Sequence, residues 1–140
     1  MNKLKPELSK KNRYWISRHR YYELKHFCLQ YKEWKTKYLS LSDPYHITIR
    51  FDERTNSDLE WSDSTADMVI KRDKYLSKMK LIEETAYQAD EVLGNYILKG
   101  VTEGLGYTYL RSVMDIPCGK EMYYNKYRRF FWLLDSKIDS

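Results

Sequence analysis

Apolar residues recur every three or four positions along most of this chain, the spacing that places them on one face of an α-helix. Between Arg13 and Leu41 this pattern predicts one long helix, and Ser17 can cap a helix N-terminus here. Asp43 and Pro44 follow, and proline disfavours helical backbone at the residue before it. The first helical region is therefore expected to end before Pro44.

A less regular segment separates this helix from the next one. Residues 46–51 alternate β-branched and polar side chains, so we interpret residues 43–63 as a connecting loop that can hold a short β-hairpin. Ser64 and Asp67 have the spacing of a capping box and predict the start of a second long helix, which continues to about Gln88. Its expected apolar stripe consists of Met68, Val69, Tyr75, Leu76, Met79, Ile82 and Ala86.

Three shorter helices are predicted in the C-terminal part of the chain, at residues 91–103, 107–114 and 120–134. Asp90 is placed to cap the first of them, and Gly104 is placed to end it. The residues expected to face inward are Val92, Leu93, Tyr96, Ile97, Val101, Tyr107, Leu110, Val113, Met114, Tyr123, Tyr127, Phe130, Phe131 and Leu134.

These elements predict an all-α fold with two parts. Residues 1–88 hold the long N-terminal helix, the loop and the long central helix, and residues 89–140 hold a trihelical helix-turn-helix unit. Gly94 and Gly100 lack side chains and allow a neighbour to approach the backbone closely. Ile116 lies in the connection between the last two predicted helices, and its side chain is expected to fill the core. An ordinary helical hairpin would show the same pattern.

Charge is distributed unevenly along the chain, whose net charge is +5. Residues 1–42 contain 11 Lys or Arg and 3 acidic residues, a net charge of +8. Residues 43–88 contain 7 and 10, a net charge of −3, and residues 89–140 contain 7 of each. The basic N-terminal segment suits a polyanion such as nucleic acid, and a solvated basic helix explains the charge equally well.

The last helix has a polar face that can read DNA. In helix-turn-helix proteins the N-terminal part of the second helix enters the major groove, where Lys or Arg bonds guanine, Asn bonds adenine and Glu bonds cytosine. Other cations hold phosphates. The residues expected to contact DNA are Lys120, Glu121, Tyr124, Asn125, Arg128, Arg129, Arg111 and Lys126. Secondary phosphate contacts are expected from Arg13, Arg18, Arg20 and Lys25.

Three segments resemble small phage transcriptional regulators of the RinA/ArpU type, whose C-terminal region is similar to the DNA-binding region 4 of sigma factors. They are HRYYELKHFCLQYKEWK, DSTADMVIKRDKYLSKMKLIEETA and ADEVLGNYILKGVTEGLGYTYLRSVMDIPCGKEMYYNKYRRFFWLL. Ser64 departs from the family pattern, which has proline there. The resemblance implies that the chain binds double-stranded DNA through a recognition helix at residues 119–135 and controls phage or mobile-element transcription.

A second interpretation is a small phage-encoded protein that binds and modulates a host protein, such as RNA polymerase or a nuclease, without being an enzyme. The acidic loop at residues 43–63 suits that role. A long helical pair beside a DNA-binding unit also permits a homodimer, which would match a palindromic site.

No residue pattern indicates catalysis, a cofactor or a metal. Phosphate-binding and hydrolase motifs are absent, and His19 and His26 have no carboxylate at a spacing that completes a metal site. Cys28 and Cys118 show no paired spacing, which favours a reducing cytoplasm. Cys118 precedes the last helix, where a thiol pKa can fall, although small-residue packing also explains it. No run approaches the roughly 18 to 20 apolar residues of a membrane span, and no secretory signal is recognised.

Overall fold

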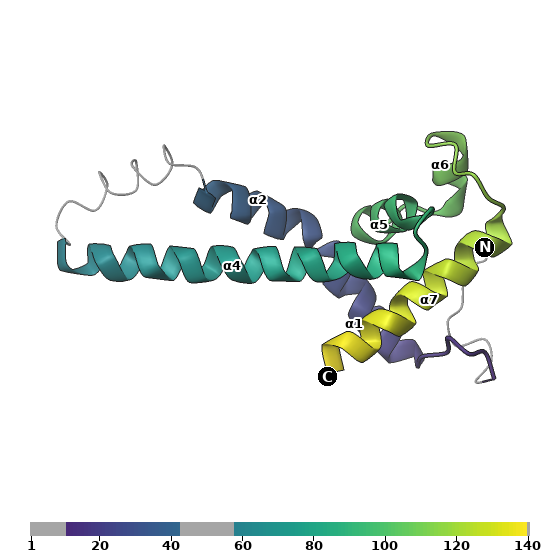
Figure 1. Cartoon of the computed structure of the whole chain (residues 1–140), viewed down its shortest axis with the longest axis horizontal. Coiled ribbons are helices and arrows are strands. Elements are labelled where there is room, and N and C mark those ends of the chain that lie inside the picture. The colour runs from purple at the N-terminus through teal and green to yellow at the C-terminus, as the bar shows by residue number, and fades with distance from the viewer. Residues whose placement is uncertain (1–10, 43–57, 140) are drawn as a thin grey trace. The chain divides into compact units, whose positions relative to one another are not determined.

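The computed structural model describes residues 11–42 and 58–139, and every regular element within these ranges is helical. The helices are α1 (Arg18–Leu29), α2 (Tyr31–Ser42), α4 (Asp58–Ala89), α5 (Gly94–Glu103), α6 (Tyr107–Ser112) and α7 (Lys120–Asp139) (Figure 1). The predicted all-α class is therefore confirmed. Most of the predicted loop at residues 43–63, with its possible hairpin, lies outside the described residues, but its last part, residues 58–63, is helical and the loop prediction is wrong there. None of these helices is long and apolar enough to cross a lipid bilayer.

The first helical region begins at its predicted cap but is interrupted. The Ser17 hydroxyl accepts a hydrogen bond from the Arg20 amide at 3.3 Å. The expected single helix is wrong, because α1 and α2 are separated at Gln30. The Gln30 amide donates to the carbonyl of Phe27 at 3.2 Å, while its side-chain nitrogen donates to the carbonyl of His26 at 3.3 Å. The side chain thus occupies the acceptor that a continuing α-helix would use.

Helix α4 begins at Asp58, not at the predicted capping box. Ser64 and Asp67 therefore lie inside the helix. A capping sequence marks the start of a helix only where the residues before it are not helical, and here the helix already includes them. The C-terminal end at Ala89 agrees with the predicted break there. The predicted stripe of α4 is buried at Met68, Met79, Ile82 and Ala86, and it is exposed at Val69.

Helix α5 starts later than predicted. The Asp90 carboxylate accepts a hydrogen bond from the Leu93 amide at 2.9 Å, so the cap acts on a turn at residues 91–93 that precedes the helix. Val92 lies in this turn and is 73% exposed, so the prediction that it faces inward is wrong. Gly104 ends α5 as predicted, with φ 70° in the left-handed region that glycine adopts at low cost.

The described helices form two compact units. One unit contains residues 11–30 and 81–139, and the other contains residues 31–42 and 58–80. This grouping differs from the predicted division after residue 88. The reason is α1, which packs against α5 and α7 and so belongs with the C-terminal helices.

In the unit of residues 31–80, α2 lies antiparallel to the first part of α4 (Figure 1). The Lys37 ammonium lies 5.8 Å from the ring centroid of Tyr75, and the Lys78 ammonium lies 5.3 Å from that of Trp34. Because the lower-numbered residue of α2 meets the higher-numbered residue of α4, the helices run in opposite directions. The buried Trp34 anchors the pair.

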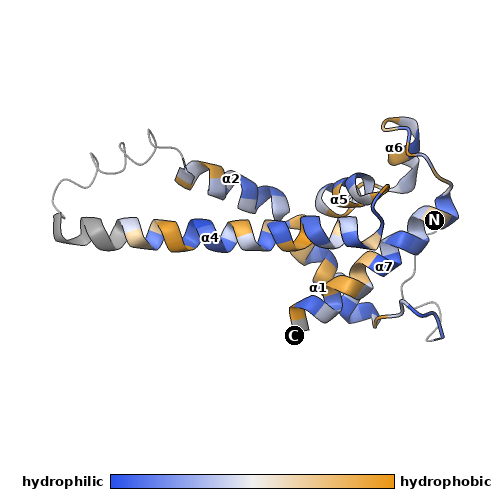
Figure 2. Cartoon of the chain, in the orientation of Figure 1, coloured by the Kyte–Doolittle hydropathy of each residue, from blue (hydrophilic) through white to orange (hydrophobic). Residues whose placement is uncertain are grey.

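In the other unit, α7 packs against α1 and α5. The hydrophobic part of α7 is its middle, whereas its first turns are mainly hydrophilic (Figure 2). Arg20 of α1 donates to the Asp135 carboxylate at 2.6 Å, and Lys137 donates to the Thr85 hydroxyl of α4 at 3.0 Å. The buried residues of α7 are Tyr123, Phe130, Phe131, Leu133 and Leu134.

As predicted, a neighbour approaches both glycines of α5 closely, and in each case that neighbour is an aromatic side chain. A Cβ at Gly94 would collide with the ring of Tyr87, and a Cβ at Gly100 would collide with the Tyr123 hydroxyl. That hydroxyl is buried and has no hydrogen-bond partner among the described residues. The close packing of α5 on α7 therefore depends on the absence of a side chain at position 100.

We predict that Gly100→Ala lowers the free energy of unfolding by about 1–3 kcal/mol, the cost of overpacking a core, despite the better helix propensity of alanine. Chemical denaturation measures this loss. In a Tyr123→Phe background the same substitution should cost much less, because the colliding oxygen is gone. Asn95→Ala on the exposed face of α5 is the control and should change stability by less than about 0.5 kcal/mol. Equal losses from Gly100→Ala in both backgrounds would contradict this packing.

Candidate nucleic-acid interface

The segment from α6 through the following turn to α7 is fixed by specific contacts. The Tyr107 hydroxyl donates to the carbonyl of Cys118 at 2.7 Å, which joins the start of α6 to the end of the turn. The Ile116 amide donates to the carbonyl of Leu110 at 3.1 Å, and the Ile116 side chain is fully buried as predicted. Asp115 has φ 54°, a left-handed conformation that lets the chain reverse direction. The turn therefore positions the N-terminus of α7.

Helix α7 has one buried face and one accessible face in its first turns. Tyr123 is fully buried, whereas Lys120, Glu121 and Asn125 are exposed. These three residues occupy the positions that the sequence predicted for base contacts. Their side chains combine donors and acceptors suited to base edges.

Two other residues predicted to read bases are only half-accessible. The Tyr124 hydroxyl accepts a hydrogen bond from the Tyr107 amide at 3.3 Å, which commits its polar atom to holding α6 against α7. The Nε of Arg128 is buried without a hydrogen-bond partner among the described residues, and burial lowers the pKa of its guanidinium group. Neither side chain projects from α7 as freely as Asn125 does.

Two predicted phosphate contacts are engaged within the protein. Arg129 donates from Nε to the carbonyl of Ala89 at 3.1 Å, where it caps the last residue of α4. The Lys126 ammonium lies 3.6 Å from a carboxylate oxygen of Asp90, the same residue that caps the turn before α5. Both cations therefore join α7 to the junction between α4 and α5. The helical pattern could not reveal this, since it gives no partner across the fold.

The remaining predicted phosphate contact in this segment is exposed. Arg111 lies 3.8 Å from the carboxylate of Asp115, and both side chains are mostly in solvent. Exposed pairs of this kind contribute about 0–1 kcal/mol, so the guanidinium group can exchange its partner for a phosphate. The accessible cations of the α6–α7 segment are thus fewer than its sequence suggests.

The four residues predicted to make secondary phosphate contacts also differ in how accessible their charged groups are. Arg13 and Arg18 are exposed. Arg20 bonds the carboxylates of Glu23 and Asp135, so its charge is matched within the fold. Lys25 is half-buried.

The residues that precede α1 lie along α7. The Tyr14 ring packs 5.5 Å from the ring of Trp132, centroid to centroid. Arg13 and Arg129 lie 5.1 Å and 6.0 Å from the centroid of the same Tyr14 ring. This arrangement brings the exposed Arg13 to the middle of α7, a contact between distant segments that no local pattern shows.

The segment also exposes apolar side chains that the sequence pattern missed. Tyr109 is 45% exposed, Val113 is 62% exposed and Met122 is 55% exposed. Val113 was expected to face inward, but α6 ends at Ser112 and the chain turns there. The sequence did contain a signal for Met122. It directly precedes the buried Tyr123, and neighbouring residues of a helix point in different directions.

Neither cysteine has the environment of a reactive thiol. Cys28 is fully buried, as expected, and burial raises its pKa. Burial and the carboxylate of Asp90 raise the pKa of Cys118, which is opposite to the decrease considered for a thiol at a helix N-terminus. Within residues 11–42 and 58–139, no group of three or more His, Cys, Asp or Glu side chains is arranged to hold a metal ion.

We predict that Arg129→Met lowers the free energy of unfolding by about 1–3 kcal/mol, because the buried carbonyl at the end of α4 loses its donor. Lys120→Met, also on α7 but exposed, should change it by less than about 0.5 kcal/mol. Urea denaturation of both variants measures the difference. If Arg129→Met were as stable as the unmodified chain, the capping role would be wrong.

Comparison with known proteins gives no relative for this chain: no family model, no curated protein and no solved structure matches it.

Proposed function

We propose that the chain is a sequence-specific double-stranded DNA-binding protein of phage or mobile-element origin that regulates transcription, with α7 as the recognition helix. The observation that carries this proposal is the two-sided character of the first turns of α7. The buried Tyr123 holds the helix in the core, while Lys120, Glu121 and Asn125 face solvent. A helix held on one side and polar on the other can enter a major groove.

The preceding elements support the proposal by their order. A short helix, α6, and a turn that contains a buried residue precede α7, as in helix-turn-helix units. The connection at residues 113–119 is longer than the usual three or four residues. The resemblance to RinA/ArpU-type regulators covers these same elements and implies the same use of α7.

The contact set proposed for DNA is smaller than the one predicted from the sequence. Lys120, Glu121 and Asn125 are assigned to base edges. Arg111 and Arg13 are assigned to phosphates, which fix the register of a protein on the duplex without reading its sequence. Arg18 is a further exposed cation available for the backbone. Arg20, Lys126 and Arg129 are left out, because their charged groups already bind within the fold.

The test starts with selection of bound sequences from a random pool of duplex DNA, followed by affinity measurements across a salt series. We predict that Lys120→Ala combined with Asn125→Ala weakens binding to the selected sequence by about 1–3 kcal/mol for each lost base contact. Binding to random DNA should fall much less, because phosphate contacts dominate it. Arg13→Ala should weaken both and reduce the salt slope by about 1.

The matched control is Lys80→Ala combined with Asn95→Ala, which removes two exposed side chains of the same types from α4 and α5. This variant should bind as the unmodified chain does. Failure to bind any duplex at low salt, or equal loss in the test and control variants, would overturn the proposal.

One observation favours a second candidate function, the binding of a host protein such as RNA polymerase. Tyr109, Val113 and Met122 place exposed apolar surface on the same segment as the proposed DNA contacts. Exposed aromatic residues and methionine are enriched where proteins bind each other. If DNA affinity were unchanged in the Lys120 and Asn125 double variant, this surface would become the better supported site.

A further inference from the structure

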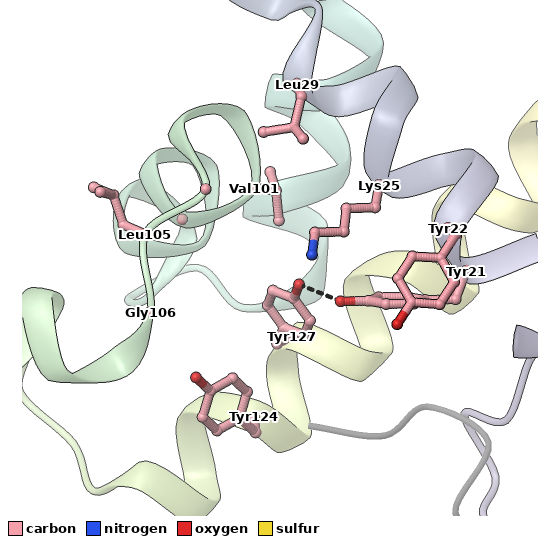
Figure 3. A pocket seen from close by; sticks show the side chains of 11 residues that line it. Tyr21, Tyr22, Lys25, Leu29, Val101, Leu105, Gly106, Tyr124 and Tyr127 are labelled. Atoms are coloured by element: carbon pink, nitrogen blue, oxygen red, sulfur yellow. Dashed lines mark hydrogen bonds between the residues drawn. The ribbon is translucent and has the colours of Figure 1, made fainter. Parts of the chain in front are cut away.

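An open pocket of about 370 Å³ lies between α1, α5, the linker to α6, and α7, within the unit of residues 11–30 and 81–139 (Figure 3). Pockets that take small organic ligands begin at roughly 300 Å³. The pocket is separate from the exposed face of α7, because Lys120, Glu121 and Asn125 do not line it. No role described above uses this space.

The wall of the pocket carries a positive charge without a matching acid. Lys25 lines it, and its ammonium group points into the cavity (Figure 3). No Asp or Glu of the described residues lines the pocket, and none of them forms an ion pair with the Lys25 ammonium within 4.0 Å. The Lys25 ammonium lies 5.8 Å from the centroid of the Tyr22 ring. An anion is therefore the favoured polar group of an occupant.

Tyrosine side chains supply the rest of the polar wall. The hydroxyls of Tyr21 and Tyr127 hydrogen-bond to each other at 2.8 Å (Figure 3). Burial, followed by the nearby Tyr21, raises the pKa of Tyr127, so its hydroxyl keeps its proton. When the Tyr21 hydroxyl is the donor of their shared hydrogen bond, the Tyr127 proton is available to an acceptor in the pocket. Tyr22 and Tyr124 add two further rings to the wall. These rings suit a flat aromatic group, which packs offset or edge to face against them.

The opposite wall is largely backbone. Gly100, Gly104 and Gly106 line it, together with Val101 and Leu105. Gly104 has φ 70°, a conformation that residues with a side chain rarely adopt, so glycine is favoured at this point of the wall. The pocket thus has one wall that is largely backbone, one wall of tyrosine rings, and the Lys25 ammonium as its cation.

We propose that this pocket binds a small planar aromatic carboxylate, with the carboxylate at the Lys25 ammonium and the ring among the tyrosine side chains. The probe is 2-naphthoate, and its neutral amide, 2-naphthamide, has nearly the same shape without the charge. Titration calorimetry at neutral pH on the full chain measures both. The carboxylate should bind about 10- to 100-fold more tightly than the amide, the range expected for a hydrogen bond to a charged group.

Lys25→Met keeps the length of the side chain and removes its charge. It should weaken 2-naphthoate binding about 10-fold or more and leave 2-naphthamide binding unchanged. Arg18→Met removes a cation from the same helix outside the pocket and should leave both affinities unchanged. Amide chemical shifts of the unmodified chain provide a measurement that does not depend on a folded variant. Shifts induced by 2-naphthoate should centre on Tyr22, Val101 and Tyr124.

Three results would overturn the proposal. They are the absence of saturable 2-naphthoate binding up to its solubility limit, equal affinities of the carboxylate for the unmodified and Lys25→Met chains, and shifts centred away from the pocket. DNA takes no part in these measurements, so their outcome is independent of the proposed DNA-binding function.

Discussion

The buried face of α7 is the constraint on which the C-terminal unit depends. Its aromatic side chains meet segments that are far apart in the sequence: the Phe131 ring lies 5.1 Å from the ring of Tyr21 in α1, and Tyr123 contacts the backbone of α5 at Gly100. Arg129 reaches the end of α4. Since one helix serves three neighbours, its orientation is determined by all of them together. The accessible face of its first turns is a consequence of that packing.

The same packing separates the cations that bond within the fold from those that stay exposed to solvent. Arg20, Lys126 and Arg129 all join α7, or α1 beside it, to another element through a carboxylate or a carbonyl. Arg20 and Lys126 are paired with carboxylates that offset their charges, so much of the electrostatic field available to a polyanion comes from other cations. Tyr124 takes part both in the α6–α7 contact and in the pocket. Its hydroxyl bonds the Tyr107 amide of α6, and the residue lines the same pocket as Lys25.

Local patterns in the sequence predicted most of the helices and few of the contacts between them. The Ser17 cap, the end of α5 at Gly104 and the buried Ile116 follow from preferences of a residue and its near neighbours. The interruption at Gln30 could not be predicted, because the apolar spacing continues across it and only the structure shows the Gln30 side chain bonded to the carbonyl of His26. The partners of Lys126 and Arg129 were equally hidden. A periodic pattern shows which face of a helix is polar, and only the tertiary fold shows what that face meets.

We infer that packing in the core holds α7 rigidly along its length, its first turns included. Residue-resolved amide hydrogen exchange under native conditions tests it most directly. We expect the amides from Tyr123 to Leu134 to exchange only with global unfolding and to show the same opening free energy as the buried amides of α1 and α5. Amides of the first half of α7 that open at a much lower free energy than those around Phe130 would contradict it. In that case the proposed recognition face would not be a preformed surface.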